Sequence, residues 1–355
     1  METLQVALGR RSYPIYIGGG LLEQAEELLH PLGVGRWAIV CDDTVAALYG
    51  APLARRTGWP LVTFPAGEGS KSLEEYDRLC RRLVQLGLTR SDGIVALGGG
   101  VTGDLAGFAA ATLLRGVALV QAPTTLLAQV DSAVGGKTGL DLPEGKNLLG
   151  CFYQPRMVLA DTVCLATLPR RQLACGMAEV IKYGCIADAA LFDKLEQGQV
   201  IDHLEETICR CVLCKKHFVE EDTNDKGRRM ILNFGHTFGH ALEKLTGFSS
   251  LSHGLAVGIG MVMAGEVGES LGVTEKGTAA RIRRVLESYG MPTASAFDFA
   301  KVVEATALDK KSFGKTLNLI LLKQIGESVI HPVDRNYLVL RYKLAAEQNR
   351  RRKLN

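Results

Sequence analysis

Several features are scarce in this chain, and each scarcity excludes a class of protein. No apolar run reaches the roughly 18 residues that a membrane-spanning helix needs. The 41 basic and 38 acidic residues leave a net charge of +3, too small to indicate a nucleic-acid or membrane partner. The nine cysteines are odd in number and scattered, as is typical of reduced thiols. The N-terminus also lacks a basic-then-apolar signal pattern, so we expect a cytoplasmic protein.

The first half of the chain has the pattern of an α/β domain. The 355 residues, 47% of them hydrophobic, are enough for two domains with cores. Short apolar runs alternate with helical patterns, which predicts a parallel sheet. We expect strands at 37–41, 61–64, 93–97 and 117–120, and helices at 72–86 and 103–114. The run 93–97 is continuously apolar and should be buried on both faces of the sheet.

The second half has the pattern of a helical domain. Beyond about residue 168, strand signals almost vanish, and only 316–322 resembles a strand. Helical patterns cover 170–186, 201–218, 236–245, 253–271 and 277–289. We therefore predict a Rossmann-like α/β domain over 1–168 and a mainly helical domain over 169–355, with the boundary near Pro169.

A glycine-rich loop follows the expected strand at 93–97. Gly98 to Gly103 reads G-x-G-x-x-G and precedes an expected helix, a context in which backbone N–H groups approach a pyrophosphate. No acid follows about 20 residues later, as in the usual dinucleotide motif, so Asp42 is an alternative ribose-binding carboxylate. Asp104 is unusual, because it would repel phosphate unless it binds a hydroxyl. A tight turn that packs a helix against the sheet is the competing interpretation.

Two lysines lie in glycine-rich sequence without periodicity. Lys137 follows Gly135-Gly136, and Lys146 follows Gly145. Exposed backbone donors together with lysine favour an anionic ligand, so we expect an anion-binding loop. Ordinary solvated loop lysines are the alternative. The G-x-x-x-x-G-K-[ST] spacing is absent, which excludes a Walker A loop.

Three of the seven histidines fall within eighteen residues, at His236, His240 and His253. The first two stand at i and i+4, on one face of an expected helix. Glu179 and Lys182 stand at i and i+3 among apolar neighbours, where a surface pair is the alternative. One carboxylate with two imidazoles is a common catalytic zinc set. Spacing alone does not decide which histidines would bind.

Together, these motifs resemble the 3-dehydroquinate synthase family of sugar-phosphate cyclases. The resemblance runs at least from Asp42 to Gly326. Its signatures are Gly98-Gly-Gly-Val-Thr-Gly-Asp, Pro123-Thr-Thr-Leu-Leu-Ala-Gln-Val-Asp-Ser, Gly135-Gly-Lys-Thr, Gly145-Lys-Asn-Leu, Phe152-Tyr-Gln-Pro, Gly176-Met-Ala-Glu-Val-Ile-Lys-Tyr-Gly and Asn233-Phe-Gly-His-Thr-Phe-Gly-His.

The resemblance implies an activity, cofactors and an assembly. A shikimate-pathway homodimer would use NAD and one divalent metal, zinc or cobalt, with a dehydroquinate synthase-like fold. It would convert 3-deoxy-D-arabino-heptulosonate 7-phosphate into 3-dehydroquinate and phosphate. The steps would be transient oxidation, phosphate elimination, re-reduction, ring opening and aldol closure.

The resemblance also implies roles for individual residues. The metal ligands would be Glu179, His236 and His253. The substrate would be held by Lys137, Lys146, Asn147, Lys182, Lys215, Arg229, Asn233, His240 and one or both of Lys310 and Lys311, with Arg115 reaching in from the neighbouring subunit. The NAD contacts would be Asp42, Glu68, Lys71, Gly99, Gly100, Asp104, Thr124, Thr125 and Thr167, with Lys137 and Lys146 shared.

One position departs from the family pattern. The family usually reads His-Gly-Glu around the last metal histidine, and this chain reads His253-Gly254-Leu255. If that glutamate orients the histidine, His253 must find another partner here. Three competing functions remain open from the residues: another sugar-phosphate cyclase, a metal-dependent alcohol or glycerol dehydrogenase, and a phospho-sugar-binding protein without activity.

Overall fold

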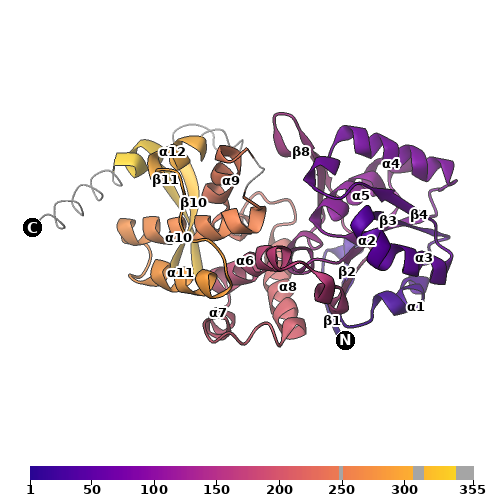
Figure 1. Ribbon diagram of the computed structural model, residues 1–355, viewed down its shortest axis with the longest axis horizontal. Coiled ribbons are helices and arrows are strands. Elements are labelled where there is room, and N and C mark those ends of the chain that lie inside the picture. Colours follow the sequence, from indigo (N-terminus) through magenta and orange to yellow (C-terminus); the bar gives the residue numbers. More distant parts are fainter. Residues whose placement is uncertain (248–250, 307–315, 341–355) are drawn as a thin grey trace, which may run out of the picture. The chain divides into compact units, whose positions relative to one another are not determined.

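The computed structural model describes residues 1–247, 251–306 and 316–340 and divides into two compact units (Figure 1). Unit 1 comprises Met1–Gly176 and His203–Asn224, and unit 2 comprises Met177–Asp202 and Asp225–Asn355. The expected boundary near Pro169 falls just before α6 (Arg170–Ile186), whereas the units change within that helix. Helix α8 (Leu204–Glu221) belongs to unit 1 because it packs against β1 and β2.

Unit 1 is built on a seven-stranded sheet with the order β1-β2-β9-β6-β5-β3-β4. All neighbouring strands run parallel except β1 and β2, which are antiparallel. The strands are β1 (Glu2–Val6), β2 (Tyr13–Gly18), β3 (Trp37–Asp42), β4 (Leu61–Phe64), β5 (Gly93–Gly98), β6 (Ala118–Pro123) and β9 (Met157–Asp161). The helices are α1 (Ala25–Leu29), α2 (Asp43–Val45), α3 (Ala51–Thr57), α4 (Leu73–Gln85) and α5 (Gly100–Thr112).

Helices cover both faces of this sheet, so the central strands have no polar face. Along β5, Ile94 and Ala96 pack into the core that contains α4 and α5, whereas Val95 and Leu97 pack into the core that contains α1 and α3. This alternation explains the continuous apolar run at 93–97 and confirms its expected burial on both faces. Because β3 lies between β4 and β5, the strand order reverses there, and ligands bind such sheets at the carboxyl ends beside that reversal.

The lysine-containing segment that we expected to be a loop is an antiparallel hairpin, and its binding of an anion stays a prediction. Strand β7 (Lys137–Leu142) pairs with β8 (Gly145–Phe152), and Gly139 lies opposite Gly150. A Cβ at Gly150 would lie 2.3 Å from the Thr138 carbonyl oxygen, so these strands approach too closely for side chains. The glycines that hide the strand pattern are therefore what the pairing requires.

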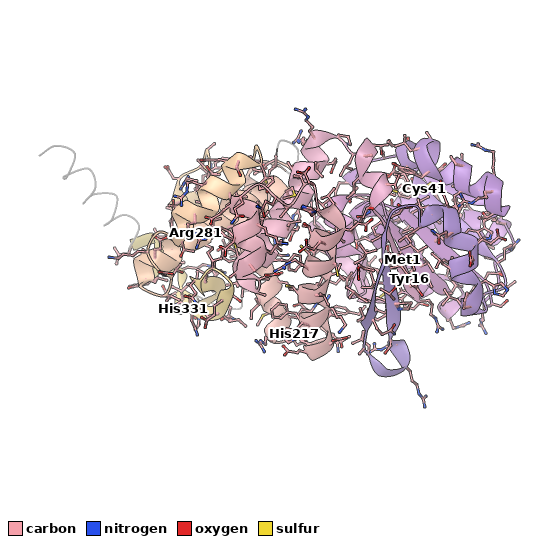
Figure 2. All side chains as sticks on the ribbon, turned by 90° about the horizontal axis from the view of Figure 1, so that it is seen from below. Met1, Tyr16, Cys41, His217, Arg281 and His331 are labelled. Carbon is pink, nitrogen blue, oxygen red and sulfur yellow. The ribbon has the colours of Figure 1, made fainter. Side chains whose placement is uncertain are left out.

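Unit 2 is mainly helical, as expected, with one antiparallel strand pair. Its elements are α7 (Ala189–Glu196), α9 (His236–Leu245), α10 (His253–Leu271), α11 (Thr278–Ser288), α12 (Phe299–Ala305), β10 (Thr316–Gln324) and β11 (Glu327–Asp334), together with most of α6. Helix α7 is tied to α11 by Arg281, labelled in Figure 2, whose guanidinium lies 2.7 Å from Glu196. Helix α10 is long and apolar enough to cross a membrane, but 72% of its apolar window is buried, as in a core helix.

Glycines allow α9 and α10 to pack backbone against backbone. Gly235 begins α9 with a left-handed φ of +79°, which places His236 at the first helical position. A Cβ at Gly260 of α10 would lie 2.0 Å from the Gly235 carbonyl oxygen. A Cβ at Gly239 would lie 3.1 Å from the Val257 backbone. This close packing brings His236 on α9 and His253 on α10 together, with ring centroids 5.2 Å apart.

The variant Gly260→Ala should therefore lose stability and move the two histidines apart. We expect the free energy of unfolding to fall by about 1–3 kcal/mol, since the new methyl group meets backbone that cannot rotate away. Urea denaturation of the full chain measures this loss, and zinc titration measures the accompanying loss of metal affinity.

Gly258→Ala is the matched control in the same helix. Its Cβ would meet only the end of the Leu286 side chain, at 3.2 Å, and alanine favours a helix over glycine by about 1 kcal/mol. Equal destabilisation by the two variants would show that the contact between the helices does not depend on Gly260.

Candidate active site

The glycine loop of unit 1 joins the carboxyl end of β5 to the N-terminus of α5. Gly99 is the N-cap and Gly100 the first helical residue, so the first N–H groups of α5 lack partners within the helix. The strand-loop-helix context expected for this motif is confirmed. Packing explains the other glycines, because a Cβ at Gly98 would lie 2.3 Å from the Thr102 hydroxyl oxygen. The loop is therefore both a tight turn and a helix N-terminus suited to an anion.

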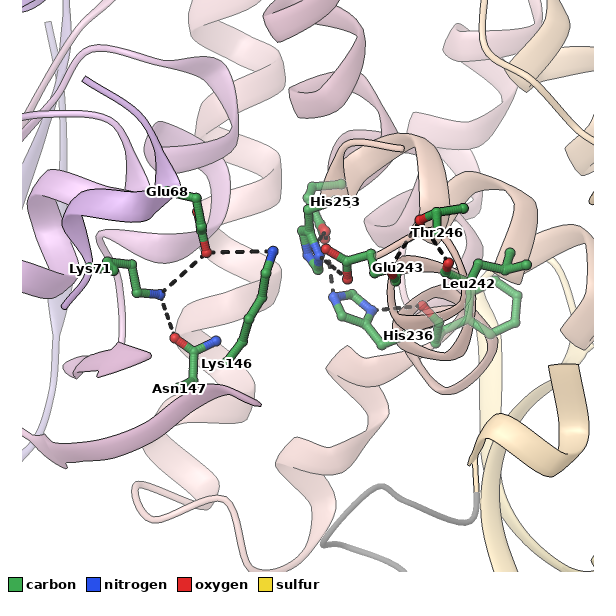
Figure 3. Close-up of polar contacts among 11 residues, drawn as sticks. Glu68, Lys71, Lys146, Asn147, His236, Leu242, Glu243, Thr246 and His253 are labelled. Atoms are coloured by element: carbon green, nitrogen blue, oxygen red, sulfur yellow. Dashed lines mark hydrogen bonds and ion pairs between the residues drawn. The ribbon is translucent and has the colours of Figure 1, made fainter. Parts of the chain in front are cut away.

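Lys71 lies at the centre of a charged cluster beside this loop, and Figure 3 shows its contacts with Glu68 and Asn147. Its ammonium group, 4% exposed, lies 2.8 Å from Asp104, 3.6 Å from Asp141 and 3.9 Å from Glu68. Burial opposes the charge, but these carboxylates outweigh that cost and raise the pKa of Lys71. Burial raises the pKa of the Asp104 carboxyl group, and the charge of Lys71 partly offsets this rise. The positive charge of Lys71 therefore offsets the negative charge of Asp104, which would otherwise repel a phosphate bound at the glycine loop.

The β7–β8 hairpin joins this cluster through two residues. Asn147 has a left-handed φ of +55°, and its backbone N–H donates to Asp141 Oδ1 at 2.8 Å. Lys71 Nζ donates to the Asn147 side-chain oxygen at 2.5 Å, and the Lys71 carbonyl accepts the Asp141 N–H at 2.7 Å. Lys146 lies 3.5 Å from Glu68. Sequence reasoning missed Asp141, since its role depends on a hairpin that we did not expect.

The remaining residues expected in unit 1 lie at the ends of strands and in turns. Asp42 ends β3 and caps α2, accepting the Val45 N–H at 2.9 Å. The Thr124 N–H donates to the Gly98 carbonyl, and Thr125 accepts the Ala128 N–H. The hydroxyl groups of Thr167 and Tyr49 lie 2.6 Å apart.

Two cationic residues of unit 1 are held in different ways. Lys215 is buried on α8 and donates to the side chain and carbonyl of Asp131. Arg115 is exposed in a turn where it and Leu114 both have positive φ values, 69° and 53°. Such backbone is strained for residues other than glycine, and strain of this kind clusters at functional sites.

In unit 2, three helices bring one carboxylate and two imidazoles together. Glu179 on α6, His236 on α9 and His253 on α10 each offer a ligand atom within 4.8 Å of the others. Glu179 Oε1 lies 3.6 Å from His236 Nε2 and 3.7 Å from His253 Nε2. His240, one turn after His236, lies outside this set and forms a second possible group with Glu243 and His253.

The buried carboxylate of Glu179 has the surroundings of a metal ligand. Neither of its oxygens accepts a hydrogen bond from the described residues, although Lys182 Nζ lies 2.5 Å from Oε2. His236 Nδ1 lies 3.1 Å from the Phe234 carbonyl, so a proton on Nδ1 leaves Nε2 unprotonated towards Glu179. Burial, then the charge of Lys182, holds the pKa of His236 well below its usual value, which keeps the ring neutral. A buried carboxylate oxygen that accepts no hydrogen bond and lies close to two imidazole nitrogens fits a cation bound between them.

The structure provides the partner that His253 was expected to need. Glu243 Oε2 lies 3.2 Å from His253 Nδ1, and the Glu243 side chain is 2% exposed. Sequence reasoning missed Glu243, although it lies seven residues after His236 and therefore on nearly the same face of α9.

The other expected substrate residues of unit 2 are mostly buried. Lys182 and Arg229 are each 1% exposed, Asn233 is half-buried at the end of η9 (Arg228–Asn233), and His240 is exposed. Buried lysine and arginine side chains can make strong charge-assisted hydrogen bonds to an anion. Lys310 and Lys311 lie outside the described residues.

Solved structures with this architecture define the class of the fold. The chain is similar to 2-deoxy-scyllo-inosose synthase complexed with carbaglucose-6-phosphate, NAD⁺ and Co²⁺, with a TM-score of 0.85 and 30% identity over 95% of this chain and 98% of that one. It is also similar to 2-epi-5-epi-valiolone synthase from Streptomyces hygroscopicus with NAD⁺ and Zn²⁺ bound, with a TM-score of 0.85 and 28% identity over 96% and 99% of the two chains. The protein therefore has the dehydroquinate synthase-like fold.

Sequence comparison narrows this class to one family. The 3-dehydroquinate synthase N-terminal model matches residues 61–175, and the C-terminal model matches residues 176–312. The chain is 43% identical over 345 residues to the 3-dehydroquinate synthase of Clostridium acetobutylicum, covering 94% of this chain and 97% of that protein. The chain belongs to the 3-dehydroquinate synthase family.

Replacing Lys71 by methionine should destabilise the protein in a pH-dependent manner. We expect a loss of about 2–4 kcal/mol at pH 7, because Asp104, Asp141 and Glu68 are left clustered but are partly exposed. The stability that comes from a carboxyl group with a raised folded-state pKa is fully present below its unfolded pKa and is lost as the pH rises through its folded-state pKa. Urea denaturation should therefore show a smaller deficit at pH 4.5 than at pH 7.

Lys146→Met is the control for this experiment. Its ammonium group is 27% exposed and lies 3.5 Å from Glu68, so its removal should cost less than about 1 kcal/mol. A deficit of Lys71→Met that stays constant between the two pH values would contradict the carboxylate cluster as its cause.

Proposed function

We propose that this protein converts 3-deoxy-D-arabino-heptulosonate 7-phosphate into 3-dehydroquinate and phosphate. It would act as a carbon–oxygen lyase in the shikimate pathway, which leads to the aromatic amino acids. The observation that carries this proposal is the buried Glu179 carboxylate, which accepts no hydrogen bond from the described residues and lies 3.6 Å from His236 Nε2 and 3.7 Å from His253 Nε2, within a chain of this family. The ring hydroxyl would be oxidised, phosphate eliminated and the hydroxyl restored before ring opening and aldol closure.

Unit 1 would bind the NAD cofactor, and unit 2 would bind the metal ion. When bound, NAD accepts and returns a hydride, so there is no net redox change, and a divalent cation such as Zn²⁺ or Co²⁺ provides Lewis-acid polarisation. Glu179, His236 and His253 would hold the cation. Gly99 and Gly100 would hold the NAD pyrophosphate at the N-terminus of α5. Asp42 lies on β3, adjacent to β5, and would bind a ribose hydroxyl.

The cationic side chains would bind the phosphate and carboxylate of the substrate. Lys182 and Arg229 are buried, so their charges are weakly screened and interact strongly with an anion. Lys215 is already oriented by Asp131 and would add a fixed charge. Lys71 is different, because three carboxylates surround it, so its role would be to hold Asp104 and Asn147 in place.

We further propose that the enzyme works as a cytoplasmic homodimer. Leu114 and Arg115 both have positive φ values, and Arg115 is exposed, as a contribution to a neighbouring subunit would require. All nine cysteines lie among the described residues and none is in a disulfide, as a reducing compartment would keep them.

The direct test is incubation with the heptulosonate phosphate, NAD and zinc, with phosphate and dehydroquinate followed together. We expect the two products in equal amounts without net NADH, since the oxidation is reversed within one turnover. Thorough chelation should abolish activity, and zinc or cobalt should restore it. Net NADH formation without phosphate release would instead indicate a dehydrogenase, and full activity without metal would exclude the Lewis-acid role.

The histidine variants separate metal binding from substrate contact. His236→Ala should lose both bound metal and turnover, because a ligand is removed. His240→Ala should keep the metal and lose rate by a factor of about 10²–10⁴, the range for a lost acid–base group. Metal content and initial rates of the two purified variants provide the comparison, and metal loss in His240→Ala would place that residue among the ligands.

Complementation tests the proposed contribution of Arg115 to the neighbouring subunit. Arg115→Ala and His240→Ala should each be nearly inactive alone. Refolded together, they form mixed dimers with one intact site, so about a quarter of the wild-type activity should return if subunits pair randomly. Activity that stays at the level of the separate variants would show that Arg115 acts within its own chain or not at all.

A further inference from the structure

We propose that Glu243 is a positioning residue that sets metal affinity by fixing the tautomer and orientation of His253. This inference rests on the proposed metal site of Glu179, His236 and His253. It concerns a residue outside that ligand set, which the proposed function does not itself require.

The two histidines of the site are held in different ways. His236 is about 10% exposed, and its Nδ1 lies 3.1 Å from the backbone carbonyl of Phe234. The His253 side chain is 36% exposed, so packing alone does not determine its ring orientation. Its Nδ1 lies 3.2 Å from Glu243 Oε2 instead (Figure 3). The His253 ring is thus less buried than the His236 ring, and it is the His253 ring that pairs with a carboxylate.

This contact determines which nitrogen of His253 faces Glu179. A neutral imidazole carries one N–H, and Glu243 can only accept a hydrogen bond when it is ionised. Pairing therefore places the proton on Nδ1 and leaves the lone pair on Nε2, the atom 3.7 Å from Glu179 Oε1. A carboxylate behind a metal-binding histidine also increases the basicity of the ligand.

The position of Glu243 suits this role. Its side chain is 2% exposed, and a buried carboxylate is costly unless a donor satisfies it. It lies on α9, whose backbone contacts α10 through the glycine packing, so the carboxylate and the His253 ring are held on rigid elements. Leu255, on α10 itself, cannot provide such an acceptor.

A second arrangement of the same atoms is possible and can be tested. His240, Glu243 and His253 also have ligand atoms within 4.8 Å of one another. An ion bound there and a second ion at Glu179 would together require both ring nitrogens of His253 to be unprotonated. The neutral ring carries a proton on one of them, which favours the hydrogen bond.

The experiment measures zinc affinity of the metal-free full chain by competition with a chromophoric chelator, together with Co²⁺ absorption spectra and thermal unfolding of the metal-free protein. For Glu243→Gln we expect zinc affinity to fall by about 10- to 100-fold, the usual effect of losing such a partner. The Co²⁺ spectrum should still indicate the same number of ligands, and stoichiometry should remain one ion per chain. Glu243→Asp retains charge but is shorter, and it should lose affinity as well.

Two further variants make the result interpretable. Glu266→Gln removes an exposed carboxylate from α10 that pairs with Arg283, and its zinc affinity should be unchanged. Glu179→Ala should lose the metal altogether. If it does not, the proposed metal site is wrong, whatever Glu243 does.

Two results would overturn the inference while leaving the metal site intact. Unchanged zinc affinity in Glu243→Gln, with only a lower unfolding temperature of the metal-free protein, would make Glu243 merely structural. Two zinc ions per wild-type chain, falling to one in Glu243→Gln, would make Glu243 a ligand.

Discussion

The arrangement of unit 2 depends on one buried charge, the carboxylate of Glu179. It is fully buried on α6, accepts no hydrogen bond from the described residues, and lies 3.6 Å from His236 Nε2 and 3.7 Å from His253 Nε2. A carboxylate of this kind is unfavourable in the absence of cations, and Lys182 supplies one of them at 2.5 Å. The helix contacts and the glycine packing bring His236 and His253 close to this carboxylate.

In unit 1 the central buried charge is positive instead of negative. There a cation, Lys71, is surrounded by the carboxylates of Glu68, Asp104 and Asp141. The cluster links the glycine loop to the β7–β8 hairpin, and it holds Asn147 in a left-handed conformation. In the proposed function, backbone N–H groups and other lysines of this unit would bind the anion, and Lys71 would hold Asp104 and Asn147 in place.

Much of this organisation could be predicted from local sequence, and the failures have physical causes. Helices α9 and α10 begin and end where their periodicity predicts, since each has an uninterrupted apolar face against the other. The β7–β8 hairpin could not be recognised, because Gly139 and Gly150 replace the side chains that mark a strand. Strand β11 was missed because His331 and Pro332 interrupt its apolar pattern.

Some candidate site residues could be predicted from local motifs, whereas others could be identified only from tertiary contacts. Motif resemblance selected Glu179, His236 and His253, and the fold brings them together, although their role as ligands stays a prediction. The sequence reasoning did not select Glu243 and Asp141, because the contacts that distinguish them are with residues on other elements. Such partners become evident only when the tertiary structure is known.

The three candidate ligands come from α6, α9 and α10. An ion bound to them would therefore link these helices and stabilise the folded state. Binding to the native state alone adds RT ln(1 + [L]/Kd) to stability, about 2.7 kcal/mol at a hundredfold excess over Kd. Metal supply would then govern the amount of enzyme as well as its rate. In a metal-poor cell, unit 2 would open more often, and proteases would remove chains that a later supply of zinc could no longer rescue.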